Sequence, residues 1–228
     1  MIFPSPPPPP PIDKNELIQR AIALAGMTLQ EISTQYKLTL PPNLQRHKGW
    51  VGQLFEYLLG ADAGSRAEPD FRHLAIELKT IPVNTRGLPK ETTYICTVPL
   101  LGEAGYHWEE SWLYNKLRQV LWIPVEGERD LPLAQRRVGM PLFWQPNEAE
   151  LKLLQTDWEE LMEMVRTGHV EEITAHIGEV LQIRPKAANS RIRSDAIGST
   201  GERIKTNPQG FYLRTSFTRE IIGQNFIR

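Results

Sequence analysis

The segment PDFRHLAIELK, residues 69–79, carries charged side chains around a run that otherwise resembles a buried strand. Residues two apart in a strand share one face and lie roughly 6.6 Å apart, so Glu77 and Lys79 are predicted to project together. Asp70 precedes the run by a short loop that can fold back toward that face. Carboxylates and a lysine in such a run need something to bind them.

A metal ion is one such partner. Glu56 lies on the polar side of the preceding helix and can approach the same face, and clustered carboxylates repel one another unless a cation neutralises them. Mg²⁺ suits this because it takes oxygen ligands and keeps waters for substrate phosphates. We therefore predict a Mg²⁺ site formed by Asp70, Glu77 and the backbone carbonyl of Leu78, with Glu56 in support.

Lys79 adds a group that can act on water or on a transition state. A protonated lysine cannot bind the metal, but it can orient or deprotonate an attacking water or neutralise charge on a phosphorane-like transition state. Metal, carboxylates and lysine together favour phosphodiester hydrolysis. The Glu-x-Lys triplet is common, however, and an ion pair between Glu77 and Lys79 on a solvated sheet face is the alternative. These residues alone leave both interpretations open.

The composition is that of a globular protein. The chain has 228 residues, of which 40% are hydrophobic and 23% charged, as in ordinary soluble domains. We find no apolar run near the ~20 residues that span a membrane and no signal peptide, so we expect a cytoplasmic protein without membrane association. The one cysteine, Cys96, excludes an internal disulfide and a cysteine-built zinc site, and its apolar surroundings predict burial.

Charge is unevenly distributed although the formal net charge is −1. Residues 146–179 hold nine acidic and two basic residues, whereas residues 184–228 hold nine basic and three acidic ones. Such asymmetry predicts either a basic face for a polyanion or two lobes that attract each other.

Two parts are expected along the chain. The proline-rich residues 1–12 are predicted to form an extended, mobile tail, since proline fixes φ and lacks an N–H; docking to an aromatic groove on a partner is the alternative. The folded part shows helix and strand patterns without regular βαβ alternation, which predicts a mixed sheet flanked by helices. Expected helices begin at Asp13 and Thr28 and span 48–60, 109–118, 147–167 and 216–226; expected strands span 74–80, 92–100, 119–125, 179–185 and 210–215.

Longer motifs then carry a resemblance. PDFRHLAIELK matches the PD-(D/E)-x-K pattern of restriction-endonuclease-like nucleases. The segments NLQRHKGWVGQLFEYLLGADAGS, AIELKTIPV, VLWIPVEGERDLPLAQRRVG, LQIRPKAAN and GFYLRTSFT closely resemble the MutH family, the strand-nicking endonucleases of methyl-directed DNA mismatch repair. The resemblance covers the chain from about Asp13 to Phe226. It implies an α/β, restriction-endonuclease-like fold, with residues 13–228 as one endonuclease domain of two lobes around a DNA-binding cleft.

The resemblance also implies an activity and partners. Members of this family cut the unmethylated strand of hemimethylated GATC sites in double-stranded DNA, 5′ to the G, with Mg²⁺. MutL activates them and couples them to MutS, and we expect a monomer. Carried onto this chain, Asp70 and Glu77 would be metal ligands, Lys79 the catalytic lysine and Glu56 a supporting carboxylate. Lys48 falls where the family keeps another active-site lysine.

Reading GATC requires contacts to base edges in the major groove. Arg184 and Lys186 flank Pro185 at the end of an expected strand, and such cations are the usual donors to guanine. Pro185 would stiffen this loop. GFYL matches the family segment that senses the methyl group of adenine, which makes Tyr212 the candidate sensor, while Phe211 alternates with it and is predicted to be core.

Two weaker candidates complete the DNA contacts. Tyr94, on an expected strand, would wedge against bases, although strand aromatics more often serve packing. Lys116 would contact a phosphate and so contribute position rather than sequence information. The alternatives to a repair nickase are a stand-alone GATC restriction endonuclease and a DNA-binding module that has lost catalysis.

Overall fold

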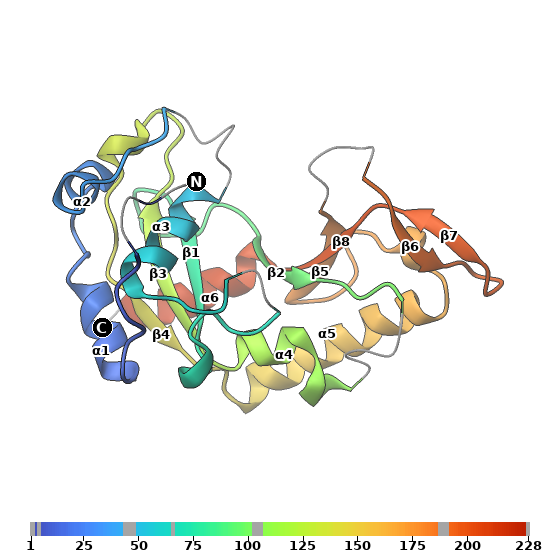
Figure 1. Cartoon of the computed structure of the whole chain (residues 1–228). Helices are drawn as coiled ribbons and strands as arrows, with labels where there is room; N and C mark the ends of the chain where they lie inside the picture. The colour runs from blue at the N-terminus through green and yellow to red at the C-terminus, as the bar shows by residue number, and fades with distance from the viewer. Residues whose placement is uncertain are drawn as a thin grey trace. The chain divides into compact units, whose positions relative to one another are not determined.

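The computed structural model divides into two compact units, whose helices and strands are labelled in Figure 1. Unit 1 comprises Met1–Lys90, Gln119–Gln145 and Ile221–Arg228, and unit 2 comprises Glu91–Arg118 and Pro146–Glu220. The described residues are 3, 6–42, 49–64, 67–101, 107–186 and 192–226. Of these, residues 224–226 are described by their backbone alone. Among them, no helix combines the length and apolar character needed to cross a membrane.

Unit 1 joins helices to a small sheet. Its elements are α1 (Lys14–Ile22), α2 (Leu29–Gln35), α3 (Trp50–Leu59), the short 3-10 turns η1 (Arg72–Leu74) and η3 (Leu133–Gln135), and strands β1 (Glu77–Val83), β3 (Val120–Glu126) and β4 (Leu142–Trp144). The predicted helix starts are confirmed: Asp13 caps α1, and Thr28 and Glu31 form a capping box at α2. Glu16 does not close a second box with Asp13, because its carboxylate instead accepts the Ile12 N–H at 2.6 Å.

The sheet of unit 1 has the order β1-β3-β4. β1 and β3 run parallel, with Glu77 paired to Val120 and Lys79 to Trp122, and β4 adds an antiparallel edge. α3 packs against β1, and a continuous apolar cluster links both to α1 and α2. β3 is buried along almost its whole length, as expected for the central strand of a covered sheet.

β1 begins later than the sequence pattern predicts. The expected strand at 74–80 is replaced by the η1 turn up to Leu74, then by Ala75 in the left-handed region at φ +54°, and the strand starts at Glu77. A backbone pair between Phe71 and Ile76 closes this turn. The consequence is that Glu77 stands at the first position of β1, directly after a tight loop that carries Asp70.

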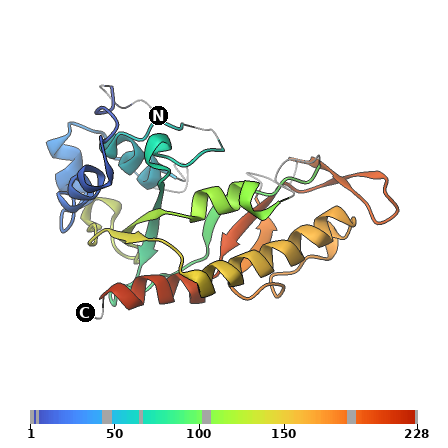
Figure 2. The same ribbon diagram turned by 90° about the horizontal axis from the view of Figure 1, so that it is seen from below.

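Unit 2 is built on an antiparallel sheet. Its elements are β2 (Thr93–Thr97), η2 (Trp108–Glu110), α4 (Trp112–Leu117), α5 (Glu148–Arg166), η4 (Val170–Glu172), β5 (Leu181–Pro185), β6 (Ser194–Ile197), β7 (Arg203–Thr206) and β8 (Gln209–Leu213); α6 (Thr215–Phe226) has residues in both units. The main sheet has the order β2-β8-β5, and β6 and β7 form a separate hairpin. The long helix α5 packs against β5 and is the long yellow-to-orange helix in Figures 1 and 2.

The structure confirms the α/β class with small sheets flanked by helices, and it corrects one interpretation of the charge pattern. The acidic segment 146–179 and nearly all of the basic segment 184–228 belong to the same unit, so they are not two lobes of opposite charge. Cys96 is buried, as predicted, and Phe211 is 1% exposed, as expected for a core residue.

A buried carboxylate fixes the start of β5. Asp157 of α5 is 4% exposed, and its two oxygens accept the backbone N–H groups of Glu179, Val180 and Leu181 at 2.7–2.9 Å. The Arg214 guanidinium donates to the carbonyls of Ala175, Ile177 and Gly178 in the same turn. Asp157 therefore binds backbone N–H groups at the turn that leads into β5, and Arg214 binds backbone carbonyls of the same turn.

Replacing Asp157 with asparagine should lower the free energy of unfolding by about 2–4 kcal/mol, because each buried N–H left without an acceptor costs about 1–3 kcal/mol. Urea unfolding followed by circular dichroism measures this. Asp195→Asn is the matched control, since Asp195 pairs with Lys205 at 2.8 Å on an exposed surface, and its loss should hardly change the free energy of unfolding. Equal losses in the two variants would contradict the anchoring role of Asp157.

Candidate active site and DNA-reading surface

The predicted catalytic residues come from neighbouring elements of unit 1. Glu56 lies in the last turns of α3, Asp70 in the loop before η1, and Glu77 and Lys79 at the head of β1. Lys48 lies outside the described residues.

Glu77 and Lys79 form a buried ion pair. Lys79 Nζ donates to Glu77 Oε1 at 2.5 Å, and the side chains are 15% and 2% exposed. The alternative of an ion pair on a solvated sheet face is therefore wrong for this pair. A buried charge persists only when it is paired or binds a metal, because desolvation otherwise costs several kcal/mol. Glu77 thus provides a buried carboxylate that is paired with the amine of Lys79.

Backbone bonds tie Asp70 to the same strand. Its Oδ2 accepts the Leu78 N–H at 2.8 Å. This carboxylate therefore lies beside Leu78, the residue between Glu77 and Lys79 whose carbonyl is the predicted metal ligand. The Asp70 carbonyl accepts the N–H groups of Asp62 and Ala63 at 3.0 and 3.2 Å. The loop that carries Asp70 thus folds back onto the start of β1, as the sequence analysis allowed.

Asp62 secures the base of this loop. Burial opposes ionisation of Asp62, but hydrogen bonds from the Arg72 N–H and guanidinium lower the pKa of its carboxyl overall. The ion pair between Arg72 and Asp62 is 2.9 Å long. Sequence reasoning missed this pair, because Asp62 and Arg72 stand ten residues apart with no periodic relation.

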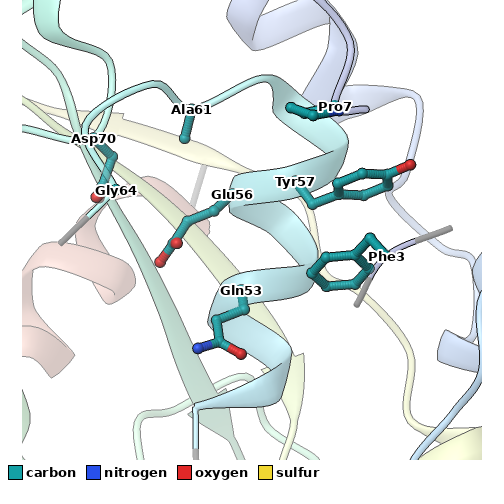
Figure 3. Close-up of a pocket in the computed structure, with 8 residues that line it drawn as sticks. All are labelled: Phe3, Pro7, Gln53, Glu56, Tyr57, Ala61, Gly64 and Asp70. Carbon is teal, nitrogen blue, oxygen red and sulfur yellow. The ribbon is translucent and has the colours of Figure 1, made fainter. Parts of the chain in front are cut away.

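Glu56 and Asp70 line one pocket of about 250 Å³, drawn in Figure 3. The figure shows Glu56 projecting from α3 and Asp70 from the facing loop, with Gln53, Tyr57 and the N-terminal residues Phe3 and Pro7 around them. Glu77 and Lys79 are not among the residues that line this pocket. The structure therefore joins the site residues as two pairs: Glu56 with Asp70 across the pocket, and Glu77 with Lys79 on β1.

The donor set fits a hard divalent cation. Among the described residues, no group of three histidine, cysteine or carboxylate side chains is close enough to hold an ion unaided. Mg²⁺ does not need one, since it is usually bound by one or two carboxylates together with waters and substrate phosphates. Asp70, Glu77 and the Leu78 carbonyl offer such a set of oxygens within one loop and strand.

The predicted base-reading residues stand at one end of the unit 2 sheet. Arg184, Pro185 and Lys186 are all exposed at and just beyond the end of β5. β8 lies between β5 and β2, and it pairs Gly210 with both Arg184 and Thr97. The exposed cations thus belong to an ordered sheet edge rather than to an isolated loop.

Two tyrosines orient these cations. The Arg184 guanidinium lies 5.9 Å from the Tyr212 ring, and Lys186 Nζ lies 2.6 Å from the centre of the Tyr94 ring. The two rings pack edge to face with centres 5.4 Å apart. Burial and the neighbouring Tyr94 raise the pKa of the Tyr212 hydroxyl, although Arg184 acts in the opposite direction.

Sequence reasoning missed two residues of this surface. Thr92 Oγ1 accepts from Arg184 Nη1 at 3.2 Å. Gly210 lies beneath both rings, and a Cβ built there would meet Tyr94 Cε2 at 2.9 Å and Tyr212 Cε2 at 3.1 Å. The only signal in the sequence was a glycine inside a strand pattern, which often marks close approach of another group.

Lys116 does not join the exposed cations. It is 8% exposed in α4, so in this structure its side chain does not present a charge to solvent. Its contact with a phosphate stays a prediction.

Comparisons with known proteins agree with this chemistry. The family model described as "MutH: DNA mismatch repair enzyme MutH" matches residues 59–157, which include the loop and strand of the candidate site. The chain is similar to the DNA mismatch repair protein MutH of Yersinia enterocolitica (strain NCTC 13174 / 8081), with 55% identity over 97% of each chain. It is also similar to the protein of that name from Photorhabdus laumondii (strain DSM 15139 / CIP 105565 / TT01), with 54% identity over 98% of this chain and 96% of the other.

Proposed function

Because the chain belongs to the MutH family of DNA mismatch repair endonucleases, we propose that it nicks the unmethylated strand of hemimethylated GATC sites on the 5′ side of the guanine, with Mg²⁺ as its metal ion. Family membership carries the nuclease activity, the binding of DNA and the dependence on a divalent metal. The target sequence, the response to methylation and the choice of Mg²⁺ are our proposal.

The pair formed by Glu77 and Lys79, 2.5 Å apart beside the Leu78-bound Asp70, is the observation that most supports this chemistry. Asp70, Glu77 and the Leu78 carbonyl would hold Mg²⁺, which when bound stabilises charge on the scissile phosphate and lowers the pKa of a coordinated water. Lys79 orients the attacking water or donates to the developing negative charge. Glu56 supports the site from the opposite wall of the pocket, and Lys48 would add a second cation.

Sequence recognition is assigned to unit 2. Arg184 and Lys186 would donate to base edges in the major groove, and Pro185 between them would limit the entropy lost on binding. Tyr212 would occupy the space that an adenine N6-methyl group needs. In this proposal Tyr94 contacts bases and Lys116 a phosphate.

Partners and context complete the proposal. The protein acts on double-stranded DNA as a cytoplasmic monomer whose residues 13–228 form one two-lobed domain. MutL activates it and connects it to mismatch-bound MutS.

Strand-specific cleavage of a labelled duplex with one GATC site tests the proposal. The duplex is supplied unmethylated, hemimethylated and fully methylated, with Mg²⁺ or with chelator. We expect metal-dependent nicking confined to the unmethylated strand and stimulated by MutL. Cutting of both strands in one binding event would favour a restriction endonuclease, and no cutting even with MutL would leave an inert DNA-binding module.

Gly210→Ala should reduce the preference for hemimethylated over fully methylated GATC by roughly tenfold, because the new Cβ displaces the Tyr94 and Tyr212 rings and small displacements at a recognition site are costly. Single-turnover nicking rates on the two duplexes give the ratio. Gly223→Ala is the matched control, since its Cβ would meet nothing within 4 Å. A wild-type ratio in Gly210→Ala would show that the ring positions do not set the preference.

A further inference from the structure

The proline-rich residues 7–12 make specific contacts with the active-site elements of unit 1, and the proposed function uses none of them. We propose that this segment, the N-terminal brace, is a positioning device for the nuclease reaction that holds α3 and the Asp70 loop in place. A polyproline chain is suited to such a role. It is extended before it binds, and its carbonyls have no internal partners and are free to accept hydrogen bonds.

The first contact joins the brace to the end of α3. Arg20 Nη1 of α1 donates to the Pro9 carbonyl at 2.8 Å and to the Leu59 carbonyl at 3.2 Å. Its other terminal nitrogen pairs with Glu16 at 2.6 Å, which fixes the guanidinium. One arginine therefore links the brace, α1 and the last residue of α3, three residues after Glu56.

The glycine that ends α3 shows how closely the brace approaches. Gly60 has φ +79°, and a Cβ there would lie 2.7 Å from the Pro9 carbonyl oxygen and 2.9 Å from that of Pro8. Only glycine satisfies both the left-handed backbone and this approach.

The second contact reaches the Asp70 loop. His73 Nε2 lies 2.7 Å from the carbonyl oxygen of Pro11, which is buried. Since a carbonyl can only accept, Nε2 carries the proton. His73 belongs to η1, between Asp70 and Glu77, so this bond ties the brace to the turn that presents both carboxylates.

The third contact is at the pocket itself. Pro7 of the brace lines it together with Glu56 and Asp70, and so does Phe3, which precedes the brace and stacks on Tyr57 with ring centres 4.4 Å apart (Figure 3). Tyr57 directly follows Glu56. The brace therefore touches both elements whose carboxylates face each other, which is the placement a positioning segment needs.

Deletion of residues 2–11, which removes Phe3 and the brace up to Pro11, tests the brace, with cleavage measured on a DNA that the full chain nicks. We expect kcat to fall roughly tenfold while KM changes by less than about threefold, because misplaced catalytic groups affect the reacting state most. Amide hydrogen exchange at residues 56–60 and 70–78 should accelerate in the metal-free protein, a readout that needs neither Mg²⁺ nor a known target sequence. Unchanged exchange and kcat would mean a mobile tail and overturn the proposal. Faster cleavage would mean that the segment covers the site and would also overturn it.

Two point variants keep the test decisive if the shortened chain unfolds. His73→Phe and Arg20→Met remove the donors to Pro11 and Pro9, and each should lower kcat about threefold and accelerate the same amides. His176→Phe, an exposed histidine of unit 2, is the control and should keep both at wild-type values. Wild-type kcat and exchange in His73→Phe and Arg20→Met would overturn the brace, whatever the target sequence proves to be.

Discussion

Replacing Lys79 with methionine should lower the rate of nicking by about 10²–10³-fold and leave DNA affinity nearly unchanged. A group that stabilises charge only in the transition state contributes that much to rate and little to ground-state binding. Methionine keeps most of the packing volume of the lysine stem and removes the donor. Single-turnover cleavage and equilibrium DNA binding, measured in parallel, separate the two effects.

The same substitution should also destabilise the metal-free protein. Glu77 is 2% exposed and would lose its cation, and breaking a buried pair costs about 3–5 kcal/mol. The double variant Lys79→Met with Glu77→Gln should recover much of the lost free energy of unfolding, because it no longer buries an unpaired charge. It should not recover any nicking activity. A double variant as unstable as Lys79→Met would show that the charge of Glu77 is not the cause.

Lys90→Met is the matched control for Lys79. Lys90 pairs with Glu128 at 2.6 Å in the same unit, but the side chains are 29% and 38% exposed. Its loss should hardly change the free energy of unfolding and should leave nicking unchanged. If Lys79→Met cleaved at the rate of Lys90→Met, the lysine of the PD-(D/E)-x-K pattern would not take part in the chemistry.

Helix positions followed from local signals, and short strands did not. Asp13, Thr28 and Asn147 cap helices whose starts the sequence predicted, since capping depends on residues three apart. β4, β6 and β7 have three or four residues each, too few for alternation to stand out, and their pairing depends on distant partners. The late start of β1 has a similar cause: the sequence does not show that Ala75 adopts a left-handed backbone.

The site was predictable as a set of residue types but not as a geometry. Spacing brought Glu77 and Lys79 to one face, and they do meet. It could not show that the pair is buried, because burial depends on which other elements pack against β1, and spacing within one strand does not specify that. Lys116 illustrates the reverse case: a contact with phosphate needs an accessible cation, yet its side chain is 8% exposed.

Replacing Tyr212 with serine should reduce the ratio of hemimethylated to fully methylated cleavage by about tenfold or more. If the ring excludes the N6-methyl group by occupying its space, removing it admits the methylated adenine, and steric discrimination of this kind amounts to about 10–200-fold. The fully methylated rate should rise more than the hemimethylated rate falls. Single-turnover rates on both duplexes distinguish this result from a general loss of binding, which would lower both equally.

Tyr212→Phe separates the ring from its hydroxyl. It keeps the contact with Arg184 and the packing against Tyr94, so steric sensing predicts a wild-type ratio. If the ratio fell instead, the hydroxyl would be the sensing group.

The pKa of Tyr212 is raised, first by burial, so the phenol stays protonated from about pH 7 to about pH 9. We therefore expect the ratio of hemimethylated to fully methylated cleavage to stay constant over this pH range, both in the wild-type protein and in Tyr212→Phe. In neither protein does residue 212 titrate within the range.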